Sequence, residues 1–231
     1  MKRFYNAVAI AAKDGDYTVE LDGRSVRTPK KALLTLPNKA LAEAVAGEWQ
    51  AQGERIRPQE MPQTKLATTA IDRVAPERAH VIATVAGYGA SDLVCYHVWG
   101  NDALLARQRQ LWQPLRARIE ARHGVRLASG SGVVPVAQAP ETLARLRRLV
   151  EAYDDLGLTA LHDFTTITGS LVIGLALAEG EIDLETAWQA GFVDELFQAE
   201  LWGEDAEAAD RRARLKADLA AARRFLDLLG A

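Results

Sequence analysis

The chain has a single cysteine, Cys95, among its 231 residues. One thiol excludes an intrachain disulfide and any zinc site built from several cysteines, and it fits a reducing compartment. Stability must therefore come from burying apolar side chains. A chain of 231 residues is long enough to build a substantial core for that purpose.

An excess of positive charge is also lacking. The 28 lysines and arginines are outnumbered by 31 aspartates and glutamates, so the net charge is −3. Proteins that bind a phosphate backbone usually carry a basic surface, and we therefore expect no nucleic-acid partner. Hydrophobic residues at 48% and charged residues at 26% are typical of a soluble globular protein, which excludes wholesale disorder.

No apolar run is long enough to cross a membrane. The longest uncharged stretch, Phe164–Ala178, falls short of the roughly 20 residues that a span needs and contains three threonines. We expect a buried core helix there, in which Gly169, Gly174 and Ala178 allow close approach of a neighbour. The apolar run after the start ends at Lys13 and leads into strand-like sequence, so neither a targeting segment nor membrane insertion is predicted.

The first 36 residues alternate short β-type runs with turn signals. Asp-Gly pairs at 14–15 and 22–23 separate alternating segments, and this pair is the strongest short-range hairpin signal. An antiparallel meander is predicted, with β-type runs at 4–11, 17–21, 25–28 and 33–36. A helix from Asn38 to about Gln52, ended by Gly53, should cover it.

The remainder is mainly helical. A connector with two prolines occupies residues 55–62, and helices are predicted over 63–74, 76–86, 102–123, 140–156, 159–178, 183–202 and 206–229. Two short β-type pieces, Leu93–Trp99 and Val133–Val136, pair with each other or join the N-terminal sheet. The predicted fold is α+β, with a small β-rich N-terminal domain over residues 1–60 and a larger helical bundle domain over 61–231.

The common enzyme motifs are missing. The sequence has no G-x-x-x-x-G-K-[ST] phosphate loop and no H-E-x-x-H or comparable spacing among its histidines, so we expect neither a cofactor nor a metal.

A small hydrolase or transferase using His162, Asp163 or Cys95 is the alternative to a protein without catalysis. In a strand, Cys95 and His97 would share a face, but such a pair also needs an orienting third group. Asp163 near the start of a helix could instead cap it.

Acids lie among large apolar residues between Ala187 and Asp205, A-W-Q-A-G-F-V-D-E-L-F-Q-A-E-L-W-G-E-D. On a single helix, the apolar arc of Leu184, Trp188, Phe192 and Leu196 would also contain Glu185 and Glu195. Two interpretations are open. Asp183 can cap the helix with Glu185 favoured in its first turn, and Glu195 can pair with an arginine. Alternatively, the segment forms a binding surface, with candidate contacts at Glu185, Trp188, Glu195, Glu200 and Trp202, whereas Trp49 and Trp112 belong to the core.

Several stretches together resemble one protein family. They are L-D-G-R-S-V-R-T-P at 21–29, L-A-E-A-V-A-G-E-W-Q-A-Q at 41–52, M-P-Q-T-K-L-A-T-T-A-I-D at 61–72, S-D-L-V-C-Y at 91–96, A-L-H-D-F-T-T-I-T-G-S at 160–170 and Q-A-E-L-W-G-E-D at 198–205. In order and spacing, the chain resembles the assembly chaperones of the F-type ATP synthase catalytic sector, specifically the family that binds the α subunit before it joins β.

The resemblance implies a β-rich N-terminal domain, a helical C-terminal domain and no enzymatic activity. It implies a partner, the unassembled α subunit, whose apolar intersubunit surface would be shielded until β arrives. It also implies a monomer when free, in the cytoplasm of a bacterium or in the mitochondrial matrix. A homo-oligomer associating through a Trp188/Trp202 face is a further alternative.

Overall fold

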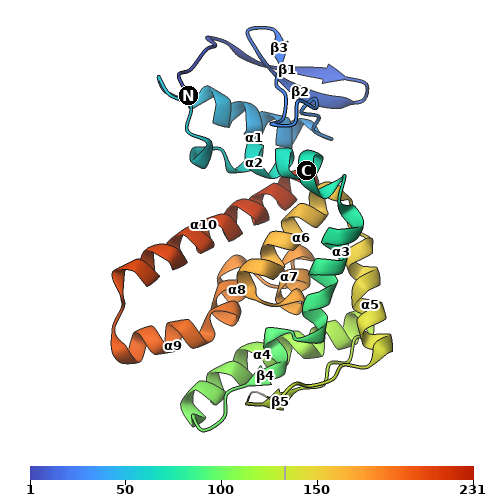
Figure 1. The fold of residues 1–231 in the computed structure, drawn as a ribbon, viewed down its shortest axis with the longest axis vertical. Coiled ribbons are helices and arrows are strands. Elements are labelled where there is room, and N and C mark those ends of the chain that lie inside the picture. Colours follow the sequence, from blue (N-terminus) through green and yellow to red (C-terminus); the bar gives the residue numbers. More distant parts are fainter. Residues whose placement is uncertain (133) are drawn as a thin grey trace. The chain divides into compact units, whose positions relative to one another are not determined.

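A computed structural model describes residues 1–132 and 134–231 of the chain. It contains a small antiparallel sheet near the N-terminus followed by a mostly helical remainder, which confirms the predicted α+β class (Figure 1). The chain forms two compact units. The first contains residues 1–78, 154–160 and 221–231, and the second contains residues 79–153 and 161–220. Each unit is thus built from more than one segment of the sequence. The predicted division instead has a single boundary, near residue 60.

The sheet of the first unit is the predicted meander. Strands β1 (Val8–Lys13), β2 (Asp16–Leu21) and β3 (Arg24–Ser25) follow one another in the order β1-β2-β3, all antiparallel. Both Asp-Gly turns have positive φ at their two residues, as a tight hairpin turn requires. The predicted run at 33–36 forms only isolated bridges, Tyr17 with Leu36 and Arg27 with Leu33.

Helix α1 (Lys39–Gln50) packs on β1 and β2 with Leu41, Ala42 and Val45 buried. The side chain of Asn38 accepts a hydrogen bond from the Leu41 backbone N–H and so begins the helix where the sequence predicted. The chain continues through the 3-10 helix η1 (Pro58–Glu60), α2 (Pro62–Thr69) and a π-helical turn, η2 (Ala70–Val74).

The end of the chain belongs to this first unit. The Asn38 side-chain amide donates to the carbonyls of Leu228 and Leu229 at 2.8 and 3.1 Å, and Gln63 Nε2 donates to Ala221 O at 3.1 Å. Phe225 is completely buried. A single core in this unit therefore draws on residues separated by about 190 positions in sequence.

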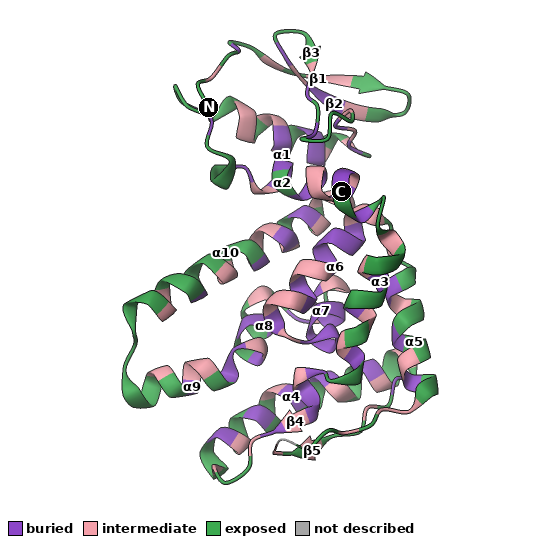
Figure 2. Ribbon diagram, viewed as in Figure 1, coloured by how far each residue is buried: buried purple, intermediate pink, exposed green. Residues whose placement is uncertain are grey.

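The second unit is helical. Its elements are α3 (Arg78–Gly87), η3 (Tyr88–Ala90), η4 (Leu93–Cys95), β4 (Tyr96–His97), α4 (Asp102–His123), β5 (Gly130–Ser131), α5 (Pro140–Glu151), α6 (Asp155–Thr168), α7 (Leu171–Ala178), α8 (Leu184–Gly191), α9 (Val193–Trp202) and α10 (Ala206–Leu229). Helices α6 and α10 contribute to both units, and Arg78, the first residue of α3, belongs to the first unit. Helix α7 is buried from Leu171 through Leu177 and contacts α4 and α8 (Figure 2). Within the described residues, no helix is both long and apolar enough to span a bilayer.

Two predicted helices are each divided in the structure. The predicted helix over 159–178 is interrupted after Thr168, where Gly169 has φ 71° and the side chain of Ser170 caps α7. The predicted helix over 183–202 is interrupted at Phe192. Gly174 does permit a close approach, because an added Cβ would lie 2.7 Å from Thr165 Oγ1, whereas Gly169 provides a left-handed conformation.

The two short β-type pieces pair differently from the simple prediction. Strand β4 pairs in parallel with β5, and neither joins the N-terminal sheet. The partner is Gly130–Ser131 rather than the predicted 133–136; Val133 lies outside the described residues, and 134–136 form no strand. Gly132, at φ 77°, turns the chain away while its N–H donates to the His97 carbonyl. Cys95 lies in η4, so the prediction that it shares a strand face with His97 was wrong.

Candidate protein-binding site

The break at Phe192 changes the environment of Trp188. Because the helix does not continue, the predicted apolar arc from Leu184 to Leu196 does not form as one stripe. Trp188 is only 4% exposed, and its ring stacks on that of Phe192 with the centroids 3.9 Å apart. Of the five predicted contact residues, Trp188 is therefore the one that the structure places in the core.

Glu185 lies on the exposed side of α8. Asp183 caps the helix by accepting from the Thr186 N–H at 2.7 Å, as the first of the two sequence interpretations expects. Hydrogen bonds from Gln189 and from Lys216, whose Nζ lies 2.6 Å from the carboxylate, hold the pKa of Glu185 below its ordinary value. Lys216 also lies 5.6 Å from the centroid of the Trp188 ring. The carboxylate is therefore ionised and accessible.

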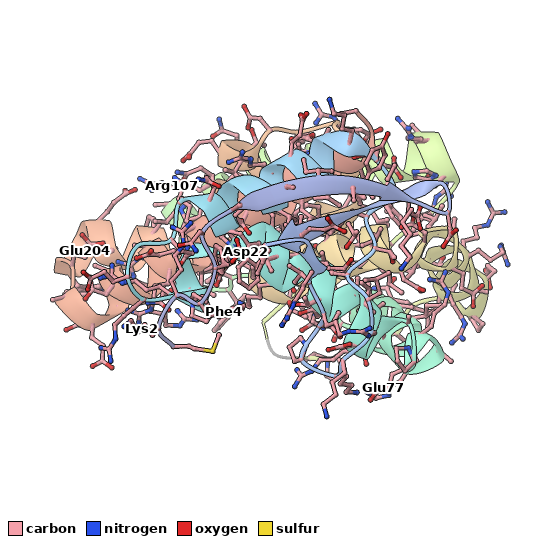
Figure 3. The ribbon with its side chains drawn as sticks, turned by 90° about the horizontal axis from the view of Figure 1, so that it is seen from above. Lys2, Phe4, Asp22, Glu77, Arg107 and Glu204 are labelled. Atoms are coloured by element: carbon pink, nitrogen blue, oxygen red, sulfur yellow. The ribbon has the colours of Figure 1, made fainter. Side chains whose placement is uncertain are left out.

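Glu195 and Glu200 are both paired with arginines. Glu195 lies 3.1 Å from Arg211 Nη1, which confirms the predicted arginine partner. Glu200 lies 2.6 Å from Arg107 Nη2, and this hydrogen bond lowers the pKa of the carboxyl group. Figure 3 labels Arg107 and also Glu204, whose carboxylate pairs with Arg212. Apart from the Arg212 side chain, these partners are 43–60% exposed, so the pairs add little to stability and can exchange partners.

Trp202 ends α9 and is 81% exposed; its neighbour Leu201 is 57% exposed. Gly203, at φ 87°, turns the chain at this point. An open groove of about 420 Å³ follows, lined by Ala199, Trp202 and Ala208, with Glu195 and Asp205 among its polar residues. We call the surface formed by Glu195, Glu200, Leu201, Trp202 and this groove the α9 face.

The alternative catalytic groups lie on two elements, Cys95 in η4 and His162 with Asp163 in α6. Burial raises the pKa of the Cys95 thiol to about 12, so it is protonated near neutral pH. His162 Nδ1 lies 3.2 Å from Asp163 Oδ1, but both residues are in the middle of α6, which begins at Asp155, so the prediction that Asp163 caps a helix was wrong. The described residues contain no group of three or more His, Cys, Asp or Glu side chains suited to a metal.

Sequence reasoning missed the partners of Glu185 and Glu200 and the exposure of Leu201. Arg107 is 93 residues from Glu200 in sequence, and no local pattern indicates such a pair. The exposure of Leu201 could have been predicted from the sequence. A Leu-Trp pair immediately before a glycine lies at a helix end, where neighbouring helices cover side chains less completely.

A two-unit α+β protein with an exposed apolar and acidic face has the features of a chaperone that binds other proteins. The family model described as ATP12 chaperone protein matches residues 2–120. The crystal structure of Atp12 from Paracoccus denitrificans is 42% identical, with a TM-score of 0.95, over 99% of this chain and 98% of that chain. An aspartate-to-lysine mutant of P. denitrificans Atp12p gives the same identity and TM-score over 99% of this chain and 97% of that one.

A curated relative extends the likeness to a eukaryote. "Protein atp12, mitochondrial" of Schizosaccharomyces pombe is 25% identical over 223 residues, which is 90% of this chain and 77% of the relative. The chain belongs to the ATP12 chaperone family. Its class is that of a chaperone for ATP synthase assembly.

Proposed function

We propose that the chain binds the unassembled α subunit of the F-type ATP synthase through the α9 face and shields the α surface that β later covers. The observation that carries this proposal is the exposure of Trp202, at 81%, beside Leu201 and a mostly apolar groove. Tryptophan contributes a large apolar area and is the residue most enriched at energetically dominant interface positions. An exposed apolar surface of this kind is suited to covering an apolar patch on a partner.

The carboxylates supply selectivity. Glu195 lines the groove and Glu200 lies on the same helix, and the two carboxylates are held by Arg211 and Arg107 in exposed ion pairs. Basic groups of a client can replace these arginines at little cost, because exposed pairs are weak. Complementary charge then favours one client over others and speeds association. Glu185 extends the acidic surface along α8 in the same unit.

Release requires an interface of moderate strength. A chaperone must give up its client when β arrives, and a small, wet interface with a polar rim meets this requirement better than a permanent one. We propose that the free chain is a monomer, and that it acts where unassembled α subunits occur, in a bacterial cytoplasm or in the mitochondrial matrix. The named relatives include a mitochondrial and a bacterial protein.

A capture experiment tests the identity of the client. The full chain is immobilised and exposed separately to purified unassembled α subunit, purified β subunit and the assembled α/β complex. We expect retention of free α only, because β lacks the matching surface and the assembled complex has it covered. Equal retention of α and β, or retention of neither, would contradict the proposal.

A further inference from the structure

Two open hollows on the first unit meet at a common set of residues. The first, of about 620 Å³, lies along α2, and the second, of about 630 Å³, lies beside the turn between β2 and β3. All of their lining residues belong to the first unit, and none belongs to the α9 face. We call the two hollows together the N-terminal groove. Four residues line both of them: Met1, Val26, Arg27 and Trp49.

Apolar side chains form most of the first hollow and reach solvent at the second. Met1, which lines both, is 75% exposed, and Phe4, which lines the second, is 63% exposed. Exposed apolar side chains around a hollow with polar residues at its rim mark sites that bind other molecules. The apolar lining of the first hollow includes Val26, Pro29, Trp49, Ile56, Pro58 and Met61.

Cations predominate among the charged side chains of the groove. Arg24 of β3 lines the second hollow, Lys65 of α2 lines the first, and Arg27 lines both. All three side chains are exposed. Over residues 1–132 and 134–231, none of the ion pairs involves any of them. Their positive charge is therefore accessible to the carboxylates of a partner.

The nearby carboxylates already accept hydrogen bonds from the backbone. Asp22, the acid that lines the second hollow, accepts from two N–H groups just before β1, at 3.1 and 2.8 Å. Glu48 accepts from the N–H groups of Gln63 and Thr64, at 2.7 and 2.8 Å, and so caps α2. These two acids hold the walls of the groove together, and an acidic partner does not have to displace them from an arginine or lysine.

We propose that the N-terminal groove binds an extended segment of a client polypeptide that contains both large apolar side chains and carboxylates. The family consists of chaperones, so a polypeptide is the class of ligand that the protein handles. Two adjoining hollows suit an extended chain, whose apolar side chains occupy the hollows while its acids meet Arg24, Arg27 and Lys65. The preferred charge is opposite to that at the acidic α9 face. Binding at this groove does not depend on the client being the α subunit.

Fluorescence anisotropy of labelled peptides added to the full chain tests this proposal. The probe is a short peptide in which leucines are interspersed with glutamates. One control peptide has lysine in place of every glutamate, and a second has serine in place of every leucine. We expect saturable binding of the first peptide and at least about tenfold weaker binding of both controls, because charge and apolar contact are each required. Equal binding of the glutamate and lysine peptides would overturn the proposal, as would the absence of saturable binding.

Substitutions at the two ends of the groove locate the bound peptide. Arg24→Glu and Lys65→Glu each reverse an exposed charge, one in each hollow, and should each weaken binding of the acidic peptide at least about tenfold. Lys13→Glu is the matched control, because Lys13 is exposed in the same unit and lines neither hollow. We expect it to bind the peptide as the wild type does. An equal loss in Lys13→Glu and Lys65→Glu would contradict binding in the groove.

A second copy of the chain and an anionic membrane are the competing occupants. Sedimentation velocity over a range of concentrations detects the first, and flotation with vesicles containing phosphatidylglycerol detects the second. We expect neither self-association nor vesicle binding that Lys65→Glu abolishes. Either result, obtained with the wild type and lost in Lys65→Glu, would assign the groove to that occupant and overturn the proposal.

Discussion

Asp92 is a buried carboxyl group that holds two helix starts together. It accepts hydrogen bonds from Ser170 Oγ and from the backbone N–H groups of Val94 and Val172, and so caps both η4 and α7. Burial raises its pKa from 3.8 to about 6, although the hydrogen bonds partly oppose the rise. The folded protein therefore binds this proton more tightly than the unfolded chain does.

The free energy of unfolding should accordingly depend on pH through Asp92. Its contribution is fully present below about pH 4 and is lost as the pH rises through 6, a change of up to about 3 kcal/mol. Urea unfolding of the wild type and of Asp92→Asn between pH 4 and 7 measures the difference. Asparagine cannot titrate, so this component should vanish from the variant even if the variant is less stable overall. Parallel pH profiles for the two proteins would rule out the assignment.

Glu185 provides a test of the acidic surface that separates binding from folding. Glu185→Lys places an ammonium group beside Lys216 at an exposed position. We expect the melting temperature to stay within a few degrees, since exposed substitutions usually cost under about 0.5 kcal/mol, while capture of the α subunit weakens. A thermal melt and a pull-down on the same preparation measure both effects.

A charge swap distinguishes the two causes of a weakened capture. The double variant Glu185→Lys with Lys216→Glu restores the ion pair but leaves the charge at position 185 reversed. If the client contacts the Glu185 carboxylate, capture should stay weak in the double variant. Full recovery in the swap would show that only the ion pair matters. A strongly destabilised Glu185→Lys protein would also count against the proposed role.

At the scale of elements, the junction between α8 and α9 depends on a close approach. A Cβ added to Gly191 would lie 2.9 Å from Thr168 Cβ and 3.1 Å from its Cα. The Cα cannot move without displacing the end of α6, so a methyl group at this position forces the backbone apart. This contact, together with the break at Phe192, brings Trp188 into the core and leaves α9 to end at an exposed Trp202.

We therefore expect Gly191→Ala to lower the free energy of unfolding by about 1–3 kcal/mol, the usual cost of overpacking. Gly47→Ala is a matched control, because Gly47 lies within α1 and an added Cβ would meet nothing within 4 Å. That substitution should instead stabilise the protein by about 0.5–1 kcal/mol. Denaturant unfolding of both variants gives the comparison. The expectation fails if Gly191→Ala is as stable as the wild type.

Local signals predicted the beginnings of elements better than their interruptions. Asn38 and Asp183 begin α1 and α8 as expected, and α4 has the predicted bounds of 102–123, because a capping side chain acts within its own turn. The breaks at Gly169 and Phe192 were missed. Helical periodicity continues through both positions in sequence, and only packing against other elements ends the helices there. The burial of Trp188 follows from the second break and was missed for the same reason.

At the scale of the whole molecule, the two units are assembled from separate parts of the chain. The C-terminal residues 221–231 complete the unit that contains the N-terminal sheet, through hydrogen bonds from Asn38 and Gln63. Composition and turn signals show where strand-like sequence gives way to helical sequence. They do not show that α6 and α10 contribute to both units. The fold class could therefore be predicted from the sequence, whereas local patterns do not show which distant segments pack together in one unit.

The chaperone role requires a surface that stays open until a client arrives. The chain leaves two tryptophans exposed to nearly the same degree, Trp202 at 81% and Trp99 at 83%. Trp202 lines a groove together with the paired carboxylate of Glu195, whereas Trp99 is not part of the α9 face. This pair of residues makes it possible to separate a specific contribution of the α9 face from the general effect of removing an exposed aromatic side chain.

The most direct measurement is the affinity of the free α subunit for the wild type, Trp202→Ala and Trp99→Ala, determined at one salt concentration. Both substitutions remove the same exposed ring and should leave the melting temperature nearly unchanged. We expect Trp202→Ala to weaken binding by at least about 2 kcal/mol, roughly thirtyfold, as a dominant interface residue does, and Trp99→Ala to bind like the wild type. Wild-type affinity in Trp202→Ala, or an equal loss in Trp99→Ala, would contradict binding through the α9 face.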